Sequence, residues 1–263
     1  MQSSKKLNIV EYRDGKVSET TDTIASEIRL RIFSHEDEIL SLLCTPTMVK
    51  EFVVGFALSE GLLADTRTGN SQQEWCSERI EILWRDEEIE VNLPVDAPKG
   101  TATLTSGCAK GITFISNTSE NELPVIQSDT RISIHSLLDL YREFQKQSAL
   151  FKDTGGVHSA ALCSDNEIFV FTEDIGRHNA VDKIIGYAFL ENISLEDKIL
   201  LLSGRLSSEI TIKAIRAHVP ILVSRAAPTD LSVEIARKSH LTLIGFLRGK
   251  HMNIYSNPKR IIQ

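Results

Sequence analysis

The second half of the chain alternates between apolar patterns of strand type and of helix type, and this alternation restricts the possible folds more than any other feature of the sequence. Short apolar runs predict strands at 159–163, 168–171, 199–202, 221–224 and 241–246. Helical spacing predicts helices at 136–148, 179–190, 207–217 and 231–238, the first with Tyr141 on its apolar face. Alternation with short connections predicts a mostly parallel sheet flanked by helices.

The first part of the chain has a different pattern. Alternating segments at 7–10, 80–84 and 89–93 predict antiparallel strands, and one helix is expected from Thr47 to about Ser59. The polar segment 117–122 has the composition of an exposed linker. The chain is therefore expected to be α/β (α+β overall). A smaller strand-rich α+β domain at 1–120 would precede a domain at 121–263 whose element order is that of the cytidine-deaminase-like three-layer fold.

The formal net charge of -7 disfavours a nucleic-acid-binding protein, but this charge is unevenly distributed. Residues 1–153 hold 16 basic and 25 acidic side chains, whereas residues 154–263 hold 13 and 11. This asymmetry indicates where an anionic partner could bind, and the alternative that explains the counts equally is an ordinary solvated surface. No apolar run approaches the roughly 20 residues that cross a bilayer, and the polar segment 1–6 does not begin a secretory signal. We therefore expect a cytoplasmic protein that binds neither membrane nor nucleic acid.

An arginine stands at each expected strand-to-helix junction of the second part and again after the last strand. Because the carboxyl ends of strands and the N-termini of helices meet at one edge of such a sheet, these arginines should converge. Guanidinium groups suit phosphate, and a glycine beside three of the four admits a large anion. Each arginine alone could be a surface ion pair or a cap, but together they predict a phosphate or nucleotide site. The four are Arg177, Arg205, Arg225 and Arg248.

Two histidines are expected at the same edge, with roles that the sequence leaves open. His178 could be an acid–base group or a hydrogen-bonded anchor, and His158 follows two glycines near the start of a strand. A zinc deaminase would need His/Cys-x-Glu at the first junction and Pro-Cys-x-x-Cys at the second. The chain has Arg-His-Asn at 177–179 and Ser-Ser-Glu at 207–209 instead, so we expect neither zinc nor deamination.

The four cysteines, Cys44, Cys76, Cys108 and Cys163, have no metal-binding spacing, and we expect free thiols. Cys44 and Cys163 end apolar runs and are expected in the core, whereas the position of Cys76 is ambiguous. Cys108 lies among small residues beside Lys110, whose charge could stabilise a reactive thiolate. Cys108 is therefore the candidate nucleophile, and the alternative is an inert loop cysteine.

One motif of the sequence is long and specific: Glu173–Lys183 reads EDIGRHNAVDK. Further motifs lie at 51–61, 106–108, 154–160, 203–207, 227–229 and 246–249. Together, and in this order, these segments resemble the FdhD/NarQ family, the formate dehydrogenase accessory sulfurtransferases. The resemblance covers about residue 51 to the C-terminus.

The resemblance implies a sulfur carrier that is required for formate dehydrogenase activity. Such a protein accepts sulfur from a cysteine desulfurase as a persulfide, here on Cys108. It passes the sulfur to the molybdenum bis(molybdopterin guanine dinucleotide) cofactor before this cofactor enters formate dehydrogenase. A homodimer is plausible on the same ground. Many members have a second cysteine where this chain has Gly111, so either one thiol suffices or a partner's cysteine resolves the persulfide.

The resemblance and the arginine edge together give the candidate site. The resemblance implies cofactor contacts in the segment 246–251, and the edge adds the residues around the junctions. Lys183 is expected to be a structural partner of Asp182 or Glu173 rather than an anion ligand. No residue is assigned to a metal. The cofactor-binding candidates are Phe246, Leu247, Arg248, Gly249, Lys250, His251, Arg177, His178, Asn179, Gly204, Arg205 and His158.

Two other functions compete with the sulfur carrier. One is a non-catalytic chaperone that binds the molybdenum cofactor and docks on formate dehydrogenase, in which case Cys108 is incidental. The other is a nucleotide-hydrolysing enzyme, which is disfavoured because the sequence shows no carboxylate cluster for a metal.

Overall fold

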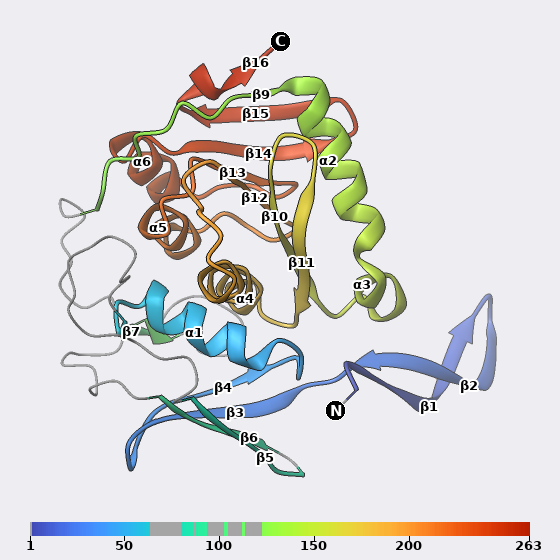
Figure 1. Ribbon diagram of the computed structural model, residues 1–263. Helices are drawn as coiled ribbons and strands as arrows, with labels where there is room; N and C mark the ends of the chain where they lie inside the picture. Colours follow the sequence, from blue (N-terminus) through green and yellow to red (C-terminus); the bar gives the residue numbers. More distant parts are fainter. Residues whose placement is uncertain (1, 64–79, 87, 94–102, 105–111, 114–122) are drawn as a thin grey trace.

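The computed structural model describes residues 2–63, 80–86, 88–93, 103–104, 112–113 and 123–263 (Figure 1). A six-stranded sheet in the order β11-β10-β12-β13-β14-β15 forms the centre of the second part. Its strands are β10 (His158–Cys163), β11 (Ile168–Asp174), β12 (Ile199–Leu202), β13 (Ile221–Ser224), β14 (Thr242–Arg248) and β15 (His251–Ser256). The helices around it are α2 (Ile134–Gln147), α3 (Ala149–Thr154), α4 (Arg177–Leu190), α5 (Ser208–Arg216) and α6 (Asp230–Lys238).

The six-stranded sheet is mixed, so the prediction of a mostly parallel sheet is wrong. β12 is parallel to β13, and β13 is parallel to β14. However, β10 is antiparallel to both of its neighbours, and β15 is antiparallel to β14. The physical reason is that short turns connect β10 to β11 and β14 to β15, and a short turn can join only antiparallel strands. The cytidine-deaminase-like description stays a prediction.

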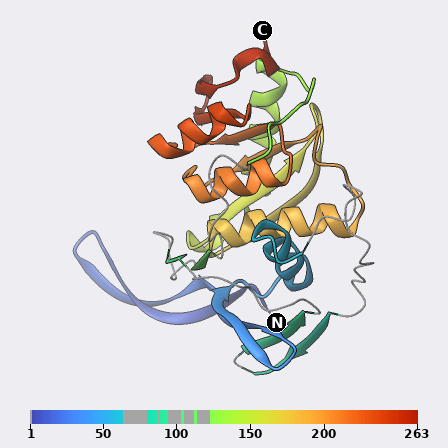
Figure 2. The same cartoon turned by 90° about the vertical axis from the view of Figure 1, so that its left-hand side faces the viewer.

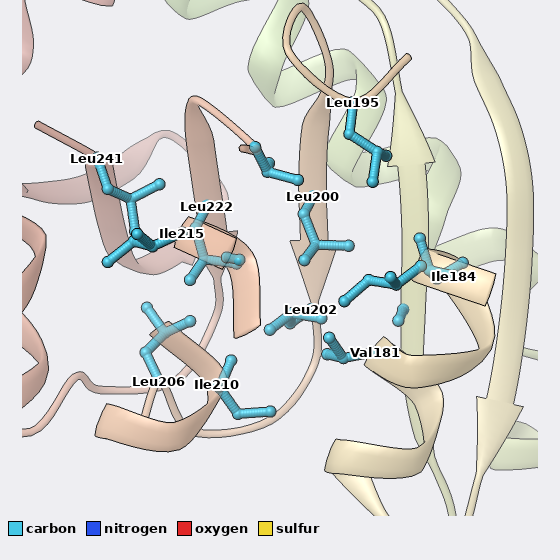
Figure 3. Close-up of a cluster of buried hydrophobic side chains, with 14 of the residues drawn as sticks. Val181, Ile184, Leu195, Leu200, Leu202, Leu206, Ile210, Ile215, Leu222 and Leu241 are labelled. Atoms are coloured by element: carbon cyan, nitrogen blue, oxygen red, sulfur yellow. The ribbon is translucent and has the colours of Figure 1, made fainter. Parts of the chain in front are cut away.

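Helices cover both faces of this sheet, and the strands are therefore apolar on both sides. Leu200 and Leu202 of β12 belong to the apolar cluster under α4, α5 and α6 (Figure 3). The alternate residues, Ile199 and Leu201, face the cluster under α2. The predicted helices and strands of this part are confirmed, and α3 and β15 are additional elements.

The first part contains a hairpin, a four-stranded sheet and a helix. The hairpin of β1 (Ser4–Arg13) and β2 (Lys16–Ala25) projects from the rest of the molecule (Figure 2). The sheet has the order β4-β3-β6-β5. Its strands are β3 (Ile28–Ser34), β4 (Asp37–Cys44), β5 (Glu81–Trp84) and β6 (Glu88–Leu93), and the helix is α1 (Val49–Ser59). Strand β7 (Thr103–Leu104) pairs with β8 (Ile112–Thr113). In the second part, β9 (Ile132–Ser133) pairs with β16 (Ile261–Ile262), and β16 follows a 3-10 helix at Pro258–Arg260.

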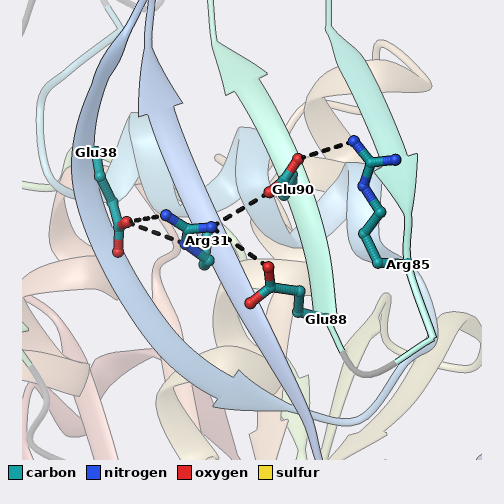
Figure 4. Close-up of polar contacts among 5 residues, drawn as sticks. All are labelled: Arg31, Glu38, Arg85, Glu88 and Glu90. Atoms are coloured by element: carbon teal, nitrogen blue, oxygen red, sulfur yellow. Dashed lines mark hydrogen bonds and ion pairs between the residues drawn. The ribbon is translucent and has the colours of Figure 1, made fainter.

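The polar face of the four-stranded sheet has a network of ion pairs (Figure 4). Arg31 of β3 pairs with Glu38 at 2.6 Å, with Glu90 at 3.2 Å and with Glu88 at 3.3 Å. Arg85 reaches the same Glu90 at 3.5 Å. These pairs are partly exposed, so the network contributes little to stability beyond fixing neighbouring strands in register.

Helix α1 lies between the four-stranded sheet and α4, with its apolar face on the sheet. It crosses α4 at two glycines that permit a very close approach of the backbones. A Cβ atom at Gly55 would lie 1.8 Å from the carbonyl oxygen of Asp182, and one at Gly186 would lie 1.8 Å from that of Glu51. Any larger residue at either position would force the helices apart. The proposed domain boundary at residues 120 and 121 lies outside the described residues and stays a prediction.

Candidate functional site

The predicted convergence of the strand-to-helix junctions at one sheet edge is confirmed. In the register of the sheet, His158 at the start of β10 lies opposite Asp174 at the end of β11, and Ala160 lies opposite Leu202 at the end of β12. The parallel strands β12, β13 and β14 end on this same edge. Helices α4, α5 and α6 begin just after these ends, so their N-termini open at this edge. We call it the arginine edge, after Arg177, Arg205, Arg225 and Arg248.

Arg177, His158 and Gly204 pack together at one end of the arginine edge. A Cβ atom at Gly204 would lie 3.1 Å from Cβ of Arg177 and 3.3 Å from Nδ1 of His158, which leaves little room for a side chain. Burial and the positive charges of Arg177 and Arg205 lower the pKa of His158, and Asp174 opposes this shift only in part. His158 is therefore a neutral imidazole beside two guanidinium groups at neutral pH.

The start of α4 is anchored by the fully buried carboxylate of Asp174. This carboxylate accepts hydrogen bonds from the backbone N–H of Gly176 at 2.8 Å and from Nδ2 of Asn179 at 2.8 Å. The same Nδ2 donates to the carbonyl of Leu43 at 3.0 Å. Asn179 was predicted as a cofactor contact, but its amide nitrogen is engaged in joining α4 to β4 and β11.

Lys183 is a structural residue, as predicted, but its partner is neither of the two expected carboxylates. Its Nζ lies 2.7 Å from Asp174, and both side chains are fully buried. Lys183 Nζ contacts Glu173 through the backbone oxygen, at 3.5 Å, and not through its carboxylate. It also donates to the carbonyl of Thr45 and to Oγ1 of Thr47, both at 3.3 Å. The side chain of Asp182 instead pairs with Lys213 of α5 at 2.8 Å. The reason is helical geometry, since consecutive residues point about 100° apart around the axis.

His178 is a neutral histidine next to a buried charged cluster. Burial, followed by the charges of Lys213 and Arg177, lowers its pKa to about 3. Its Nε2 atom is buried and has no hydrogen-bond partner among the described residues. Lys213 in turn pairs with Asp182 and, at 3.0 Å, with Glu60 at the end of α1. His178 is therefore not a cation near neutral pH, and its buried Nε2 leaves one hydrogen-bonding position without a partner among the described residues.

Three arginines present positive charge at the edge that no carboxylate neutralises within the described part of the chain. The side chains of Arg205 and Arg225 are exposed, and neither guanidinium has a hydrogen bond or ion pair to a described residue. Arg248 is exposed too, and its Nε donates to the carbonyl of Arg225 at 3.3 Å. Guanidinium groups without anionic partners are chemically suited to bind phosphate, so the sequence prediction of a phosphate site at this edge stays a prediction.

The segment 246–251 contains the bulged end of β14, a turn at Gly249 and Lys250, and the first residue of β15. The pairing register shifts between Gly245 and Arg248, and the backbone of Phe246 is left-handed, with φ of 54°. The side chains at 248–251 are exposed, so they can contact a ligand. The side chain of Leu247, in contrast, is 1% exposed and packs in the core under α2, so this candidate can offer a ligand only its backbone.

The cysteines divide into two groups. Cys44 and Cys163 are free and buried, which confirms the prediction that both belong to the core. Burial raises the pKa of each thiol to about 12, so neither forms a reactive thiolate near neutral pH. Cys76 and Cys108 lie outside the described residues, as do Lys110 and Gly111.

Tyr141 is a residue of the edge that the sequence placed only on an apolar helix face. It is 3% exposed, and its hydroxyl lies 3.1 Å from both the carbonyl of Leu202 and the backbone nitrogen of Arg225. The sequence does contain one indication of this role: a tyrosine on a buried helix face needs a hydrogen-bond partner for its hydroxyl.

Two general features of the described residues complete the description. Within the described ranges, no three or more His, Cys, Asp and Glu side chains are grouped so that they could hold a metal ion. Of the helices in the described part of the chain, none is both long enough and apolar enough to span a membrane.

Comparison with known proteins gives a consistent result along nearly the whole chain. The model of the FdhD/NarQ family matches residues 25–262. The sulfur carrier protein FdhD of Bacillus pumilus (strain SAFR-032) is 35% identical over 259 residues, which cover 98% of both chains. That of Bacillus subtilis (strain 168) is 34% identical over 253 residues, which cover 95% of this chain and 94% of the relative. A crystal structure from Desulfotalea psychrophila, described as a formate dehydrogenase accessory protein, superposes with a TM-score of 0.77 at 26% identity and covers 99% of this chain and 100% of its own.

Proposed function

The chain belongs to the FdhD/NarQ family, and from this premise we propose that it is a sulfur carrier that serves formate dehydrogenase. The observation that carries the proposal is the arginine edge. Exposed guanidinium groups lie on neighbouring strand ends without carboxylate partners among the described residues, and they offer an anionic ligand a local positive patch on a chain that is acidic as a whole. The names of the relatives supply the chemistry, since they describe sulfur carriers and a formate dehydrogenase accessory protein.

The sulfur is proposed to be carried on Cys108. The Cys108 thiolate attacks the outer sulfur of a cysteine persulfide on a cysteine desulfurase. The sulfur–sulfur bond of the donor breaks, its electron pair leaves with the thiolate of the donor, and a new sulfur–sulfur bond forms on Cys108. The inert character of Cys44 and Cys163 supports this choice, because a thiol with a pKa of about 12 is almost fully protonated at neutral pH. One thiol is enough for this step, so Gly111 in place of a second cysteine is compatible with it.

The proposed acceptor is the molybdenum bis(molybdopterin guanine dinucleotide), which is a substrate that the protein binds and releases. Arg177, Arg205 and Arg248 would bind its phosphates. The ends of β11 to β14 span four strand spacings, roughly 19 Å at ~4.8 Å per spacing. An edge of this width suits a ligand with two separate diphosphate groups better than one with a single phosphate.

Partners and location follow from the same proposal. The sulfur donor would be a cysteine desulfurase, and the client would be formate dehydrogenase. We further propose that the protein acts in the cytoplasm as a homodimer, and that its second part has the cytidine-deaminase-like layered fold without the zinc chemistry. Sulfur transfer from one protein to a bound acceptor makes it a sulfurtransferase.

Peptide mass spectrometry tests the covalent step. The protein is incubated with a cysteine desulfurase and cysteine, and the peptides that contain Cys108 and Cys163 are compared. We expect a gain of one sulfur atom on Cys108 in the wild type and in Cys163→Ala, the matched control, and no gain in Cys108→Ala. A Cys108 peptide without added sulfur would contradict the carrier and would leave the non-catalytic chaperone, whose use of the arginine edge would be the same.

A further inference from the structure

The loop after β13, residues 225–229, is hydrogen-bonded to the loop after β12. At its start, Oγ of Ser224 donates to the carbonyl of Gly204 at 2.6 Å. Further along, the backbone nitrogen of Leu206 donates to the carbonyl of Ala227 at 3.1 Å. The position of this loop is therefore tied to the loop that presents Arg205.

The same loop is also bound to the end of β14 on its other side. The backbone nitrogen of Phe246 donates to the carbonyl of Ala226 at 3.2 Å, and Nε of Arg248 donates to the carbonyl of Arg225 at 3.3 Å. Arg225 therefore occupies the middle position among the three parallel strands, between the arginine after β12 and the arginine at the end of β14.

Tyr141, on α2, holds the loop 225–229 from the face of the sheet that α2 covers. Its hydroxyl donates to the carbonyl of Leu202 at 3.1 Å and accepts the backbone N–H of Arg225 at 3.1 Å. Burial raises the pKa of Tyr141 to about 12, so the hydroxyl keeps the proton that it donates to Leu202. One buried hydroxyl thus links the ends of β12 and β13.

We propose that Arg225 is a further contact for the phosphate-bearing substrate, and that Tyr141 is the positioning residue that holds it. This inference rests on the proposed function, because it assumes that the arginine edge binds a guanine nucleotide. The Arg225 side chain is exposed and has no polar partner within the described residues, while its backbone is held on both sides. A fixed backbone with an unneutralised guanidinium group is the arrangement expected of a preorganised anion ligand.

Titration with guanosine diphosphate tests the contribution of Arg225. Loss of a hydrogen bond to a charged group costs about 1.5–3 kcal/mol, so Arg225→Gln should weaken the affinity by a factor of roughly 10 to 150. The dependence of the affinity on salt should also become weaker, because one charge has been removed. Arg225→Lys should recover part of the affinity and part of its salt dependence. The matched control is Arg237→Gln. Arg237 is an exposed arginine in the last turn of α6, away from the edge, so this substitution should change neither the affinity nor its salt dependence.

Tyr141→Phe tests the positioning role with a different signature. Affinity should fall by a factor of roughly five to ten, whereas the salt dependence should match that of the wild type because no charge has changed. The double variant Tyr141→Phe/Arg225→Gln should bind about as weakly as Arg225→Gln alone, because Tyr141 acts only through Arg225. Tyr187→Phe is the control, since the hydroxyl of Tyr187 has no hydrogen bond to a described residue.

Two failures can be told apart. A wild-type protein that binds no guanosine diphosphate would contradict the arginine edge and the proposed function with it. A wild-type protein that binds the nucleotide while Arg225→Gln binds equally well would overturn only this inference. Full additivity of Tyr141→Phe and Arg225→Gln would show that Tyr141 affects nucleotide affinity independently of Arg225 and would overturn its positioning role.

Discussion

Replacement of Lys183 by methionine should destabilise the whole protein, because it removes the cation from a fully buried ion pair. Lys183 and Asp174 are 2.7 Å apart, and both side chains are completely inaccessible to solvent. The substitution keeps the volume and length of the side chain but leaves the Asp174 carboxylate without a counter-charge. The carboxylate also receives hydrogen bonds from Gly176 and Asn179, so it cannot turn toward water without disrupting the start of α4.

The expected loss follows from the cost of an uncompensated buried charge, which is about 3–5 kcal/mol. The hydrogen bonds that remain on Asp174 place the expectation at the lower end, about 3 kcal/mol. The assay is urea unfolding followed by circular dichroism at neutral pH. Lys146→Met is the control, because Lys146 pairs with Glu143 on the surface and should contribute no more than ~0.5 kcal/mol. A loss below about 1 kcal/mol for Lys183→Met would refute the reasoning.

Three further predictions concern the helix crossing, the histidines and the arginine edge. Gly186→Ala should lower the free energy of unfolding by at least ~2 kcal/mol, because its Cβ would lie 1.8 Å from a backbone oxygen. Gly156→Ala is the control, and it should change the free energy of unfolding little, because its Cβ would have its nearest contact at 3.4 Å. The folded-state pKa of His178, about 3, lies below its ordinary value of 6.5, so neutral His178 stabilises the fold above that value. This stability is lost as pH falls from about 6.5 toward 3, and the unfolding free energy of the wild type should fall more steeply there than that of His178→Gln. The raised pKa of Asp182 makes the opposite contribution, because it adds stability as pH falls. This contribution is the same in the wild type and in His178→Gln, so the difference between the two proteins reports on His178. Arg205→Ala should reduce guanosine diphosphate affinity about tenfold, and Arg131→Ala, which is also exposed, should not.

Most elements around the six-stranded sheet could be predicted from sequence because their apolar spacing is local information. Strand order is not local, so the position of β10 between β11 and β12 could not be derived from any apolar run or turn. The strand β3 was overlooked although its signal is present. Ile28, Leu30 and Ile32 alternate with polar residues, and all three are buried.

The arginine edge could be predicted because one topological rule brings residues that are distant in sequence to the same place. The partners of individual side chains could not be predicted in this way. Tyr141 binds groups 61 and 84 residues further along the chain, and no pattern within its own helix indicates them. Likewise, Lys183 pairs with Asp174 and not with Asp182 because of the direction in which each side chain leaves its backbone.

The transfer of labelled sulfur tests the central claim most directly. The protein is loaded with 35S by a cysteine desulfurase, separated from it, and mixed with formate dehydrogenase and the molybdenum bis(molybdopterin guanine dinucleotide) cofactor. We predict that the label leaves Cys108 and appears in the cofactor of an active dehydrogenase, and that Cys108→Ala gives neither label nor activity. Equal activation of formate dehydrogenase by Cys108→Ala would contradict the sulfur carrier.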